Sequence, residues 1–258
     1  MKAVILAGGF GTRLSEETGI VPKPLIEIGG RPMLWHIMKI YAAHDVNDFI
    51  VCCGYKGNLI KDYFVNYYHR NSDITVDLSD NSIEVRRPAT EPWRVTLVDT
   101  GPDSLTGGRI KRVREHIGGE TFCMTYGDGV SNIDIGKLLA FHRDQGTLAT
   151  VTAVHLPGRF GALDFSGDDP KVKRIREKSL QDGQTINGGF FVLEPQVLDY
   201  IDGDLTTWEE EPLQRLVAEG ELSVYRHDGF WQNMDTLRDK HLLQSLWDGG
   251  APPWKIWS

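Results

Sequence analysis

Residues 1–14 of the chain read MKAVILAGGFGTRL, and this stretch decides the class of fold. The apolar run 3–7 (AVILA) has the length of a buried strand, and it opens directly into a loop with three glycines. A glycine-rich loop between a strand and a helix leaves backbone N–H groups exposed, and such groups bind anions. The stretch therefore predicts an α/β fold whose first loop holds a phosphate group.

Strand-like and helical runs alternate after this loop. The first half of the chain has helical runs at 32–44 and 56–68 and strand-like runs at 48–53, 94–99 and 121–126, whereas the second half has strand-like runs at 147–154, 161–165, 187–193 and 222–226 and a helix from about Asp235 to Trp247. This order is typical of βαβ units. We expect one domain over residues 1–258, in which helices flank a mixed sheet and the polar stretch 71–92 makes an antiparallel excursion.

The helical run 32–44 has an apolar stripe. Leu34, Ile37, Met38 and Tyr41 recur at helical spacing after Pro32, a residue that suits the first turn of a helix. This helix is predicted to pack on the sheet and to carry no chemistry.

Composition excludes several classes of partner. The 258 residues carry a formal net charge of -8, which argues against nucleic acid and membrane surfaces as partners. No run approaches 18 apolar residues, and the N-terminal run stops at Ala7. The three cysteines, Cys52, Cys53 and Cys123, lack the spacing of a zinc site, and the two neighbours are expected to face opposite sides of a strand. We expect a cytoplasmic protein.

Two cations distinguish the glycine loop from a simple turn. Gly9, Gly11 and then Leu14 break the dinucleotide pattern GxGxxG, and no GK[ST] follows at the P-loop spacing. However, Arg13 lies inside the loop, and Lys23 lies between two prolines that fix the backbone on either side. A phosphate site with positioned charges is the favoured interpretation, and a tight turn with a solvated arginine and lysine is the alternative.

Further motifs carry a family resemblance. AGGFGTRL followed by PKPL resembles the signature of the sugar-1-phosphate nucleotidylyltransferases. The blocks EPWRVTLVDTG, TGGRIKRV, YGDGV, GRFGALDF, INGGFFV, TTWEEEPL and GFWQNMDTLRDK are similar to the branch of that family that uses CTP. The resemblance spans the chain from Lys2 to about Trp257. It implies a Rossmann-like, mostly parallel sheet and the reaction of CTP with α-D-glucose 1-phosphate to give CDP-glucose and pyrophosphate, with Mg²⁺.

The resemblance also implies a nucleotide site. Arg13 and Lys23 are expected to meet the triphosphate, and the loop after the first strand and the turn at Thr100 are expected to contact base and ribose through backbone. Arg109 faces the nucleotide in this interpretation, although a surface arginine at a helix start is the alternative. The expected nucleotide-binding residues are Leu6, Ala7, Gly8, Gly9, Gly11, Thr12, Arg13, Lys23, Thr100, Gly101, Ser104, Thr106, Arg109 and Gly127.

For the sugar phosphate, the resemblance implies that Lys178 holds the phosphate group and acts in catalysis with Arg13 and Lys23. The expected sugar-binding residues are Gly161, Glu177, Lys178, Asn187 and Gly188. Ser179 departs from the family, which has a proline after this lysine. The alternatives are an exposed lysine in a charge-rich run for Lys178 and a strand-end cap for Glu177 or Asn187.

Carboxylates are the expected metal ligands, because Mg²⁺ prefers oxygen and is usually held by one or two Asp or Glu side chains together with phosphates and water. Asp128 follows an apolar run and lies between glycines, and Asp235 precedes the terminal helix. By the resemblance both bind Mg²⁺. The alternatives are a turn residue for Asp128 and a helix N-cap for Asp235.

The expected reaction needs no general base. The second pKa of a phosphate monoester is about 6, so the attacking oxygen is already ionised. Positioning and charge neutralisation then carry the catalysis. The sequence accordingly has no Ser/His/Asp or Cys/His grouping that would activate a nucleophile.

Other functions remain as alternatives. A thymidylyl- or uridylyltransferase would share the glycine loop, since these residues do not fix the base. A glycosyltransferase would normally bring a DxD-like pair, whereas Asp128 is followed by Gly129 and Val130. A nucleotide-sugar sensor would need neither the lysines nor two separated aspartates. We also expect a homo-oligomer, with the apolar tail APPWKIWS (251–258) as a docking patch, and core packing rather than the sugar pocket for Trp208 and Trp231.

Overall fold

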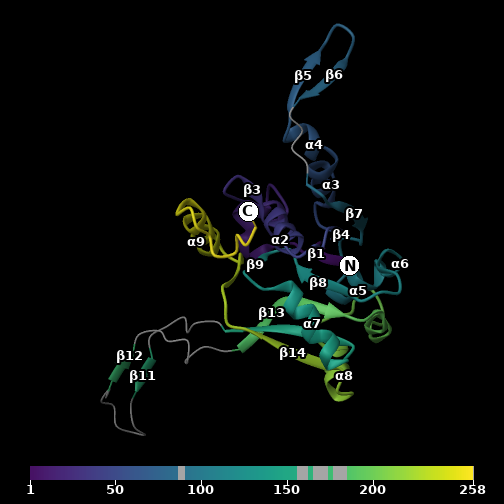
Figure 1. Cartoon of the computed structure of the whole chain (residues 1–258), viewed down its shortest axis with the longest axis vertical. Helices are drawn as coiled ribbons and strands as arrows, with labels where there is room; N and C mark the ends of the chain where they lie inside the picture. The colour runs from purple at the N-terminus through teal and green to yellow at the C-terminus, as the bar shows by residue number, and fades with distance from the viewer. Residues whose placement is uncertain (87–90, 156–161, 165–173, 177–184, 258) are drawn as a thin grey trace.

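A seven-stranded sheet forms the centre of the computed structural model, which describes residues 1–86, 91–155, 162–164, 174–176 and 185–257 (Figure 1). The strands follow the order β14-β10-β13-β8-β1-β4-β7. Their bounds are β1 Lys2–Ala7, β4 Asp48–Cys53, β7 Arg94–Asp99, β8 Phe122–Tyr126, β10 Ala149–His155, β13 Thr185–Leu193 and β14 Leu222–His227.

The sheet is mixed and mostly parallel, which confirms the predicted fold class. β1 pairs in parallel with β4 and β8, β4 with β7, and β10 with β14. Only β13 runs antiparallel to its neighbours β8 and β10. The carboxyl ends of β1, β4, β7 and β8 therefore meet at one edge of the sheet, where ligands bind in α/β folds.

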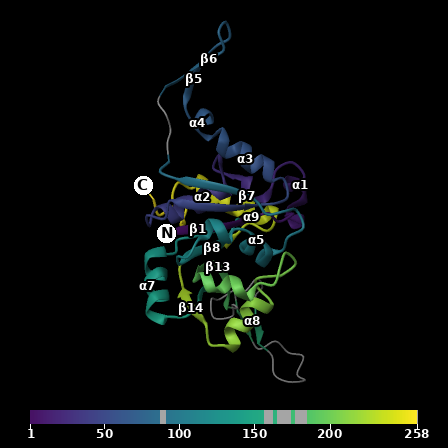
Figure 2. The same ribbon diagram turned by 90° about the vertical axis from the view of Figure 1, so that its right-hand side faces the viewer.

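Helices cover both faces because β1 is apolar on both. Ala3, Ile5 and Ala7 face one core, and Val4 and Leu6 face the other. Figure 2 shows α7 and α8 on opposite sides of the strands. The first core includes residues of α2 Met33–Ala42, α3 Gly57–Val65, α7 Ile135–Gln145 and α9 Leu237–Asp248, and the second includes residues of α5 Thr106–Arg112, α6 Arg114–Ile117, η4 Pro195–Tyr200 and α8 Glu211–Ala218.

The adjacent cysteines confirm the predicted orientation. Cys53 lies in the first core and Cys52 in the second. Both thiols and Cys123 are buried and free.

The helical run 56–68 is two helices rather than the single one predicted. At Asn66 the backbone leaves the helical region, and the side-chain Nδ2 donates to the carbonyl oxygen of Asp62 (2.9 Å). The backbone N–H of Asn66 donates to the same oxygen (3.2 Å), so the side chain competes with the backbone for this acceptor where α3 ends and α4 Tyr67–Arg70 begins. The predicted antiparallel excursion follows as a hairpin of β5 Asp73–Asp77 and β6 Ser82–Arg86, which extends away from the sheet beyond α3 and α4 (Figure 1).

Short elements complete the described chain. They are η1 Thr12–Leu14, α1 Ser15–Thr18, η2 Lys23–Leu25, β2 Glu27–Ile28, β3 Arg31–Pro32, β9 Gly129–Ser131, β11 Ala162–Asp164, β12 Arg174–Arg176 and β15 Trp231–Asn233.

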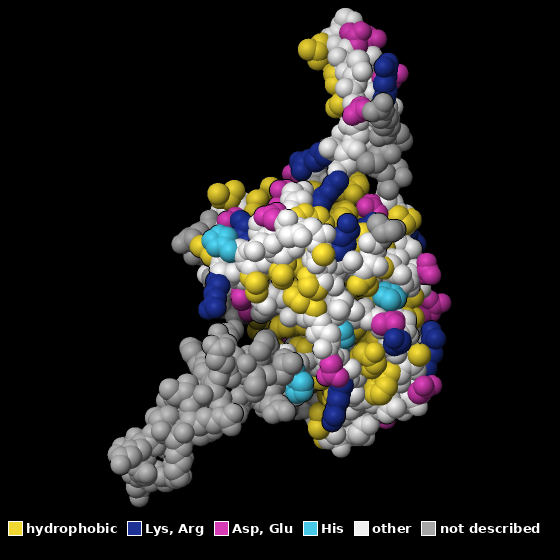
Figure 3. Space-filling model, turned by 60° about the vertical axis from the view of Figure 1, so that its left-hand side comes forward, with side chains coloured by type: hydrophobic (Ala, Val, Ile, Leu, Met, Phe, Trp, Pro, Cys, Tyr) yellow, Lys and Arg dark blue, Asp and Glu magenta, His cyan; other side chains and the backbone are white. Residues whose placement is uncertain are grey.

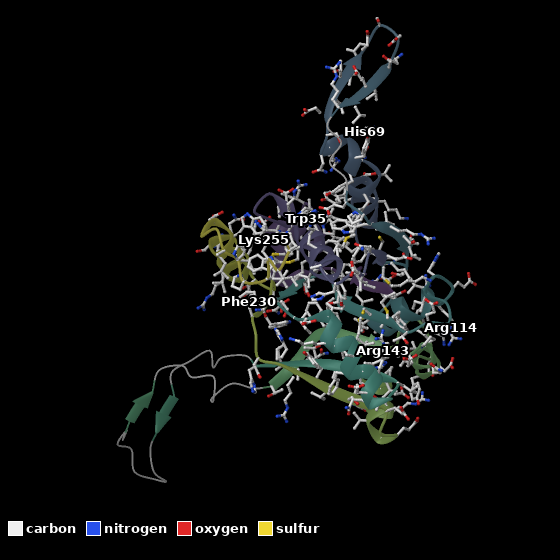
Figure 4. The ribbon with its side chains drawn as sticks, viewed as in Figure 1. Trp35, His69, Arg114, Arg143, Phe230 and Lys255 are labelled. Atoms are coloured by element: carbon white, nitrogen blue, oxygen red, sulfur yellow. The ribbon has the colours of Figure 1, made fainter. Side chains whose placement is uncertain are left out.

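The aromatic tail packs on its own chain, which covers most of its aromatic surface, and its docking on a neighbour stays a prediction. Trp254 is 1% exposed and stacks on Phe230 (ring centroids 5.7 Å apart), and Trp257 packs edge-on against Trp35 (5.7 Å). Figure 4 marks Trp35, Phe230 and Lys255 around this end of the chain, beside α2 and α9. Because the tail covers the outer side of α2, burial of that helix extends beyond the predicted apolar stripe.

In the part of the chain that the structure describes, no helix combines the length and the apolar character that a bilayer crossing requires.

Candidate functional site

A cavity of about 410 Å³, here called the first cavity, lies where the carboxyl ends of the parallel strands meet. Most of the predicted nucleotide-binding residues line it. These are Leu6, Ala7, Gly8, Gly9, Gly11, Thr12, Lys23, Ser104, Thr106, Arg109 and Gly127, and the other lining residues are Phe10, Pro24, Pro102, Asp103, Leu105, Tyr126, Asp128 and Asp235.

The glycine loop presents its backbone to this cavity. The carbonyl oxygen of Gly8 turns into the protein and accepts from the backbone N–H of Tyr55 (3.1 Å). Gly11 has a positive φ of 63°, a conformation that glycine adopts without strain. None of the backbone hydrogen bonds among the described residues uses the N–H of Gly9, Phe10 or Gly11 as donor. These groups are therefore available to an anion.

Arg109 lies behind the loop and is 4% exposed, so the alternative of a surface arginine is wrong. Its guanidinium donates to the carbonyl oxygens of Gly8 (3.0 Å), Gly101 (2.7 Å) and Pro102 (3.1 Å) and to Oγ1 of Thr100 (2.8 Å). Burial lowers the pKa of this guanidinium, since all four acceptors are uncharged. Arg109 thus ties the loop after β1 to the turn after β7.

The predicted turn residues Thr100 and Gly101 contact Arg109 and do not line the cavity. The Thr100 hydroxyl also donates to the carbonyl oxygen of Cys53 at the end of β4 (2.7 Å). The guanidinium leaves no space for a side chain at two glycines, because a Cβ at Gly8 or Gly54 would lie 2.2 Å or 2.3 Å from its Nη1. Three strand ends therefore meet on one side chain.

Lys23 joins the two predicted metal ligands. Its Nζ lies 2.6 Å from Oδ2 of Asp128 and 2.6 Å from Oδ1 of Asp235. The lysine side chain is 12% exposed, and the carboxylates are 31% and 19% exposed, so water screens this group of charges only in part. Burial alone lowers the pKa of Lys23, but the two carboxylates raise it above the ordinary value. The lysine is therefore a cation at neutral pH.

Asp235 does not cap the terminal helix, so that alternative is wrong. Thr236 is the N-cap and forms a capping box with Asp239, in which each side chain binds the backbone of the other. Asp235 is left to pair with Lys23. Asp128 lies in the turn between β8 and β9. Its carbonyl oxygen accepts from the backbone N–H of Met234 (2.8 Å), which brings Asp235 beside it.

A second cavity of about 230 Å³ adjoins the first and shares Tyr126, Asp128 and Asp235 with it. The predicted sugar-binding residues Asn187 and Gly188 line this second cavity. Its other lining residues are Thr125, Gly129, Ile186, Gly189, Phe190, Trp231 and Asn233.

Four predicted site residues cannot be placed in full. Gly161, Glu177 and Lys178 lie outside the described residues. Arg13 lies in η1, and the description does not extend to its side chain.

The tryptophan predictions divide. Trp208 is fully buried in the second core, as predicted. Trp231 packs against the first core, as predicted, but it also lines the second cavity, where its Nε1 donates to the carbonyl oxygen of Gly188 (2.7 Å). Trp231 is brought to the cavity by the pairing of β15 with β9, in which it lies opposite Ser131. Because these two positions are 100 residues apart along the chain, the sequence has no local signal for this placement.

Sequence reasoning also missed Tyr126 and Phe10. Tyr126 ends β8 directly before Gly127 and Asp128, and this place at a strand end was the available signal. Phe10 is half exposed at the first cavity and packs against Tyr55. An exposed aromatic side chain inside a glycine loop offers a surface on which a base or ribose can pack.

Residues 2–240 match the family model described as nucleotidyl transferase. The chain belongs to the nucleotidyl transferase family. It is 57% identical over 258 residues to the glucose-1-phosphate cytidylyltransferase of Salmonella typhi, with 100% of each chain covered, and 47% identical, again with full coverage, to the probable glucose-1-phosphate cytidylyltransferase of Bacillus subtilis.

Solved structures support the family fold. HddC from Yersinia pseudotuberculosis superposes with a TM-score of 0.69 at 24% identity and covers 95% of this chain and 99% of its own. A UDP-glucose pyrophosphorylase complexed with UDP-glucose gives a TM-score of 0.67 at 14% identity, with 96% and 98% covered. At these identities the likeness concerns the fold of this nucleotidyl transferase.

For a nucleotidyl transferase, the shared wall of the two cavities is the important feature. Two ligands in adjoining cavities would meet at Asp128 and Asp235, where Lys23 supplies positive charge. The arrangement can bring two anions together and neutralise them.

The same wall fits a divalent cation. Asp128 and Asp235 lie together around Nζ of Lys23, and two carboxylates is the number that Mg²⁺ usually takes from a protein when phosphates complete its coordination. Within the described ranges no group of three His, Cys, Asp or Glu side chains could hold a metal by itself, so the site suits a cation that arrives with phosphate.

Proposed function

We propose that the chain transfers a cytidylyl group from CTP to α-D-glucose 1-phosphate and so forms CDP-glucose and pyrophosphate. Identity of 57% over the full length to a protein named for this reaction supports the assignment. The single structural observation that carries it is the meeting of two cavities at Lys23, Asp128 and Asp235. The nucleotide would occupy the first cavity and the sugar phosphate the second.

The chain's own groups position the reactants in this mechanism. The N–H groups of the glycine loop hold the triphosphate, and Arg109 holds the loop in place. An oxygen of the sugar phosphate attacks the α-phosphorus in line, and pyrophosphate leaves. Because Lys23 is already protonated, it acts as a fixed positive charge and not as a base. We assign Arg13 to the departing pyrophosphate and Lys178 to the phosphate of the sugar, by the family resemblance.

We assign Asp128 and Asp235 as the residues that hold Mg²⁺. When bound, Mg²⁺ neutralises phosphate charge and polarises the phosphoryl oxygens. Lys23 holds both carboxylates at the wall between the cavities, and Asn233 supports Asp235 by donating from Nδ2 to its Oδ2 (2.7 Å).

A pyrophosphate-release assay tests the function. Glucose 1-phosphate is supplied with CTP, UTP, dTTP, ATP or GTP in turn. CTP is expected to give at least a tenfold higher kcat/KM than any other nucleotide, which corresponds to about 1.4 kcal/mol of transition-state stabilisation. Excess EDTA should stop the reaction, and added Mg²⁺ should restore it. Equal rates with all five nucleotides would refute the choice of CTP, and full activity in EDTA would refute the metal site. Preference for dTTP or UTP would establish the thymidylyl or uridylyl alternative.

We propose the cytoplasm as the location, because Cys52, Cys53 and Cys123 are unpaired thiols, as is usual in a reducing compartment.

We further propose that the hairpin β5–β6 joins copies of this chain. Cross-strand pairs Ile74–Val85 and Val76–Ile83 place apolar side chains on one face, and the pairs Asp73–Arg86 and Thr75–Glu84 place polar ones on the other. Ile74 is 45%, Val76 47% and Ile83 55% exposed. Figure 3 shows the yellow side chains along one side of this arm. A two-stranded hairpin alone is only marginally stable in water, so a covering surface is expected.

A second copy offers a suitable surface. An apolar groove of about 290 Å³ lies beside β7, the edge strand of the sheet. Around a twofold axis, the hairpin of each copy can cover the groove of the other copy, so the same contact between hairpin and groove forms twice. The groove is lined by Phe64, Val65, Tyr67, Glu91, Trp93, Val95 and Leu97.

Light scattering on a sizing column tests this assembly. The wild-type protein is expected at a multiple of the 29.0 kDa chain mass, and Val76→Lys at 29.0 kDa, because a buried charge would oppose the contact. Thr75→Lys is the matched control, since position 75 lies on the polar face opposite Glu84, and it should keep the wild-type mass. A monomeric wild-type protein, or equal dissociation of both variants, would refute the proposal.

A further inference from the structure

The wall between the two cavities rests on a carboxylate that lines neither of them. Tyr126 lines both cavities, and its hydroxyl donates to Oε1 of Glu209. Glu209 precedes α8 in the stretch TTWEEEPL, 83 positions from Tyr126 along the chain. Among the described residues, no lysine, arginine or histidine forms an ion pair with this glutamate. Its partners are hydroxyl groups.

The second partner belongs to the other side of the site. Oγ1 of Thr106, the first residue of α5, donates to Oε2 of Glu209 (2.5 Å). The same Thr106 hydroxyl accepts from the backbone N–H of Trp208 (2.9 Å), so its proton is directed to the glutamate. α5 also carries Arg109, which ties the glycine loop to the turn after β7. One carboxylate therefore binds both the wall and the helix that holds the first cavity.

The direction of these hydrogen bonds fixes what the wall offers to a ligand. An ionised carboxylate only accepts, so the hydroxyl proton of Tyr126 is committed to Glu209 and only its lone pairs remain. Asn187 lines the second cavity together with Tyr126, and its Oδ1 accepts from the backbone N–H of Gly189 (2.8 Å).

The ring of Tyr126 lies against Gly189 and Phe191. A Cβ at Gly189 would lie 2.6 Å from its Cδ2, so only glycine leaves room for the ring, which packs edge-on against Phe191 at 6.3 Å between centroids. The Tyr126 hydroxyl, whose proton is donated to Glu209, can therefore only accept, and the Asn187 amide, whose Oδ1 accepts from Gly189, keeps its Nδ2 as a donor. Such a pair suits a ligand with neighbouring hydroxyl groups, which both donate and accept.

We propose that Glu209 is a positioning residue for the sugar phosphate, acting through the acceptor hydroxyl of Tyr126, and that it also fixes α5 through Thr106. This inference rests on the proposed assignment of the second cavity to the sugar. Glu209 touches neither substrate. It sets the hydrogen-bond polarity of the wall that the sugar hydroxyls meet.

Glu209→Gln tests this role while keeping the size of the side chain. The amide must donate from its nitrogen, so one of the two hydroxyls has to turn round. The KM for glucose 1-phosphate is expected to rise about tenfold, with kcat within threefold of the wild-type value. Tyr126→Phe, which keeps the ring and the glutamate, should give the same rise. In the double variant the rise in KM should stay about tenfold, because both substitutions remove the same interaction.

Glu210→Gln is the matched control, since this neighbouring carboxylate is exposed and forms no contact with either cavity. It should leave KM unchanged. A wild-type KM in Glu209→Gln, or a hundredfold rise in KM in the double variant, would overturn the proposal. A tenfold rise in KM in the control Glu210→Gln would overturn it as well. The kinetics are measured with whichever nucleotide the wild-type protein prefers. A wrong assignment of CTP therefore leaves this test intact.

Discussion

Alanine in place of Lys23 is expected to lower kcat/KM by about 100- to 1000-fold, the usual loss on removing one fixed group that stabilises transition-state charge. The lysine is the cation that the described structure places between Asp128 and Asp235, at 2.6 Å from each. Without it, the wall between the two cavities has two negative charges where two anionic substrates must meet. Steady-state pyrophosphate release measures the effect.

Lys39→Ala is the matched control for this result. Lys39 is also partly buried and paired with one carboxylate, Glu91 at 3.1 Å, but it lines neither cavity. Its loss should leave kcat/KM within twofold of the wild-type value. Asp128→Asn, which keeps the lysine and removes one carboxylate charge, should also reduce turnover by at least 100-fold. A wild-type rate in the variant of Lys23 or of Asp128, with thermal unfolding unchanged, would contradict the assigned roles.

The stability of the fold is expected to fall by about 3 kcal/mol between about pH 6.5 and pH 4 because of His36. Burial lowers the pKa of this imidazole to about 4, with a further small contribution from the charge of Arg31. The unfolded chain, with an ordinary pKa, takes up the proton first as the pH falls. The free energy of unfolding therefore has its full contribution from neutral His36 above pH 6.5 and loses it as the pH falls from about 6.5 to 4.

The surroundings of His36 explain why it stays neutral. Its Nε2 lies 2.9 Å from the carbonyl oxygen of Ile28, and its Nδ1 accepts from Nε1 of Trp254 (3.4 Å). A second proton on Nδ1 would oppose the indole N–H, so the tail would lose its contact. The rings that face it belong to Trp35, Trp247, Trp254 and Trp257.

Urea unfolding at pH 7 and at pH 4.5 measures the loss, and His36→Asn should remove the part that this residue causes. NMR of the imidazole provides a check that does not depend on the variant, since the ring signals should remain those of the neutral form at pH 5.5. A midpoint near 6.5 for this histidine would contradict the expectation.

Local patterns allowed much of the fold to be predicted. The run 48–53 coincides with β4, because a strand inside a parallel sheet is apolar over most of its length, and the run 94–99 coincides with β7, the partly buried edge strand. The stripe of α2 was also correct, but its further burial was not foreseen, since the tail that covers it comes more than 200 residues later. Contacts between distant positions leave no periodic trace in the sequence.

The site, too, could be predicted only in part. The glycine loop and Lys23 between two prolines have local sequence signatures, and the family motifs pointed to Asp128 and Asp235. The ion pairs that join these residues span 105 and 212 positions, and the bond of Tyr126 to Glu209 spans 83. Hydrogen-bond direction depends on such pairings, so the acceptor role of Tyr126 had no signal in the sequence. The roles of Arg13, Glu177 and Lys178 stay predictions, as does the division of the chain into a single domain.

The guanidinium behind the glycine loop limits how this protein can diverge or be redesigned. Because a Cβ at Gly8 would overlap Arg109, a mutation at Gly8 requires the arginine to be shortened, and shortening it releases the loop after β1 and the turn after β7 together. At Gly54 a Cβ would also lie 2.7 Å from the carbonyl oxygen of Gly8, so a shorter arginine does not make room there. A library that aims to change the preferred nucleotide should vary positions 8 and 109 jointly and leave Gly54 untouched.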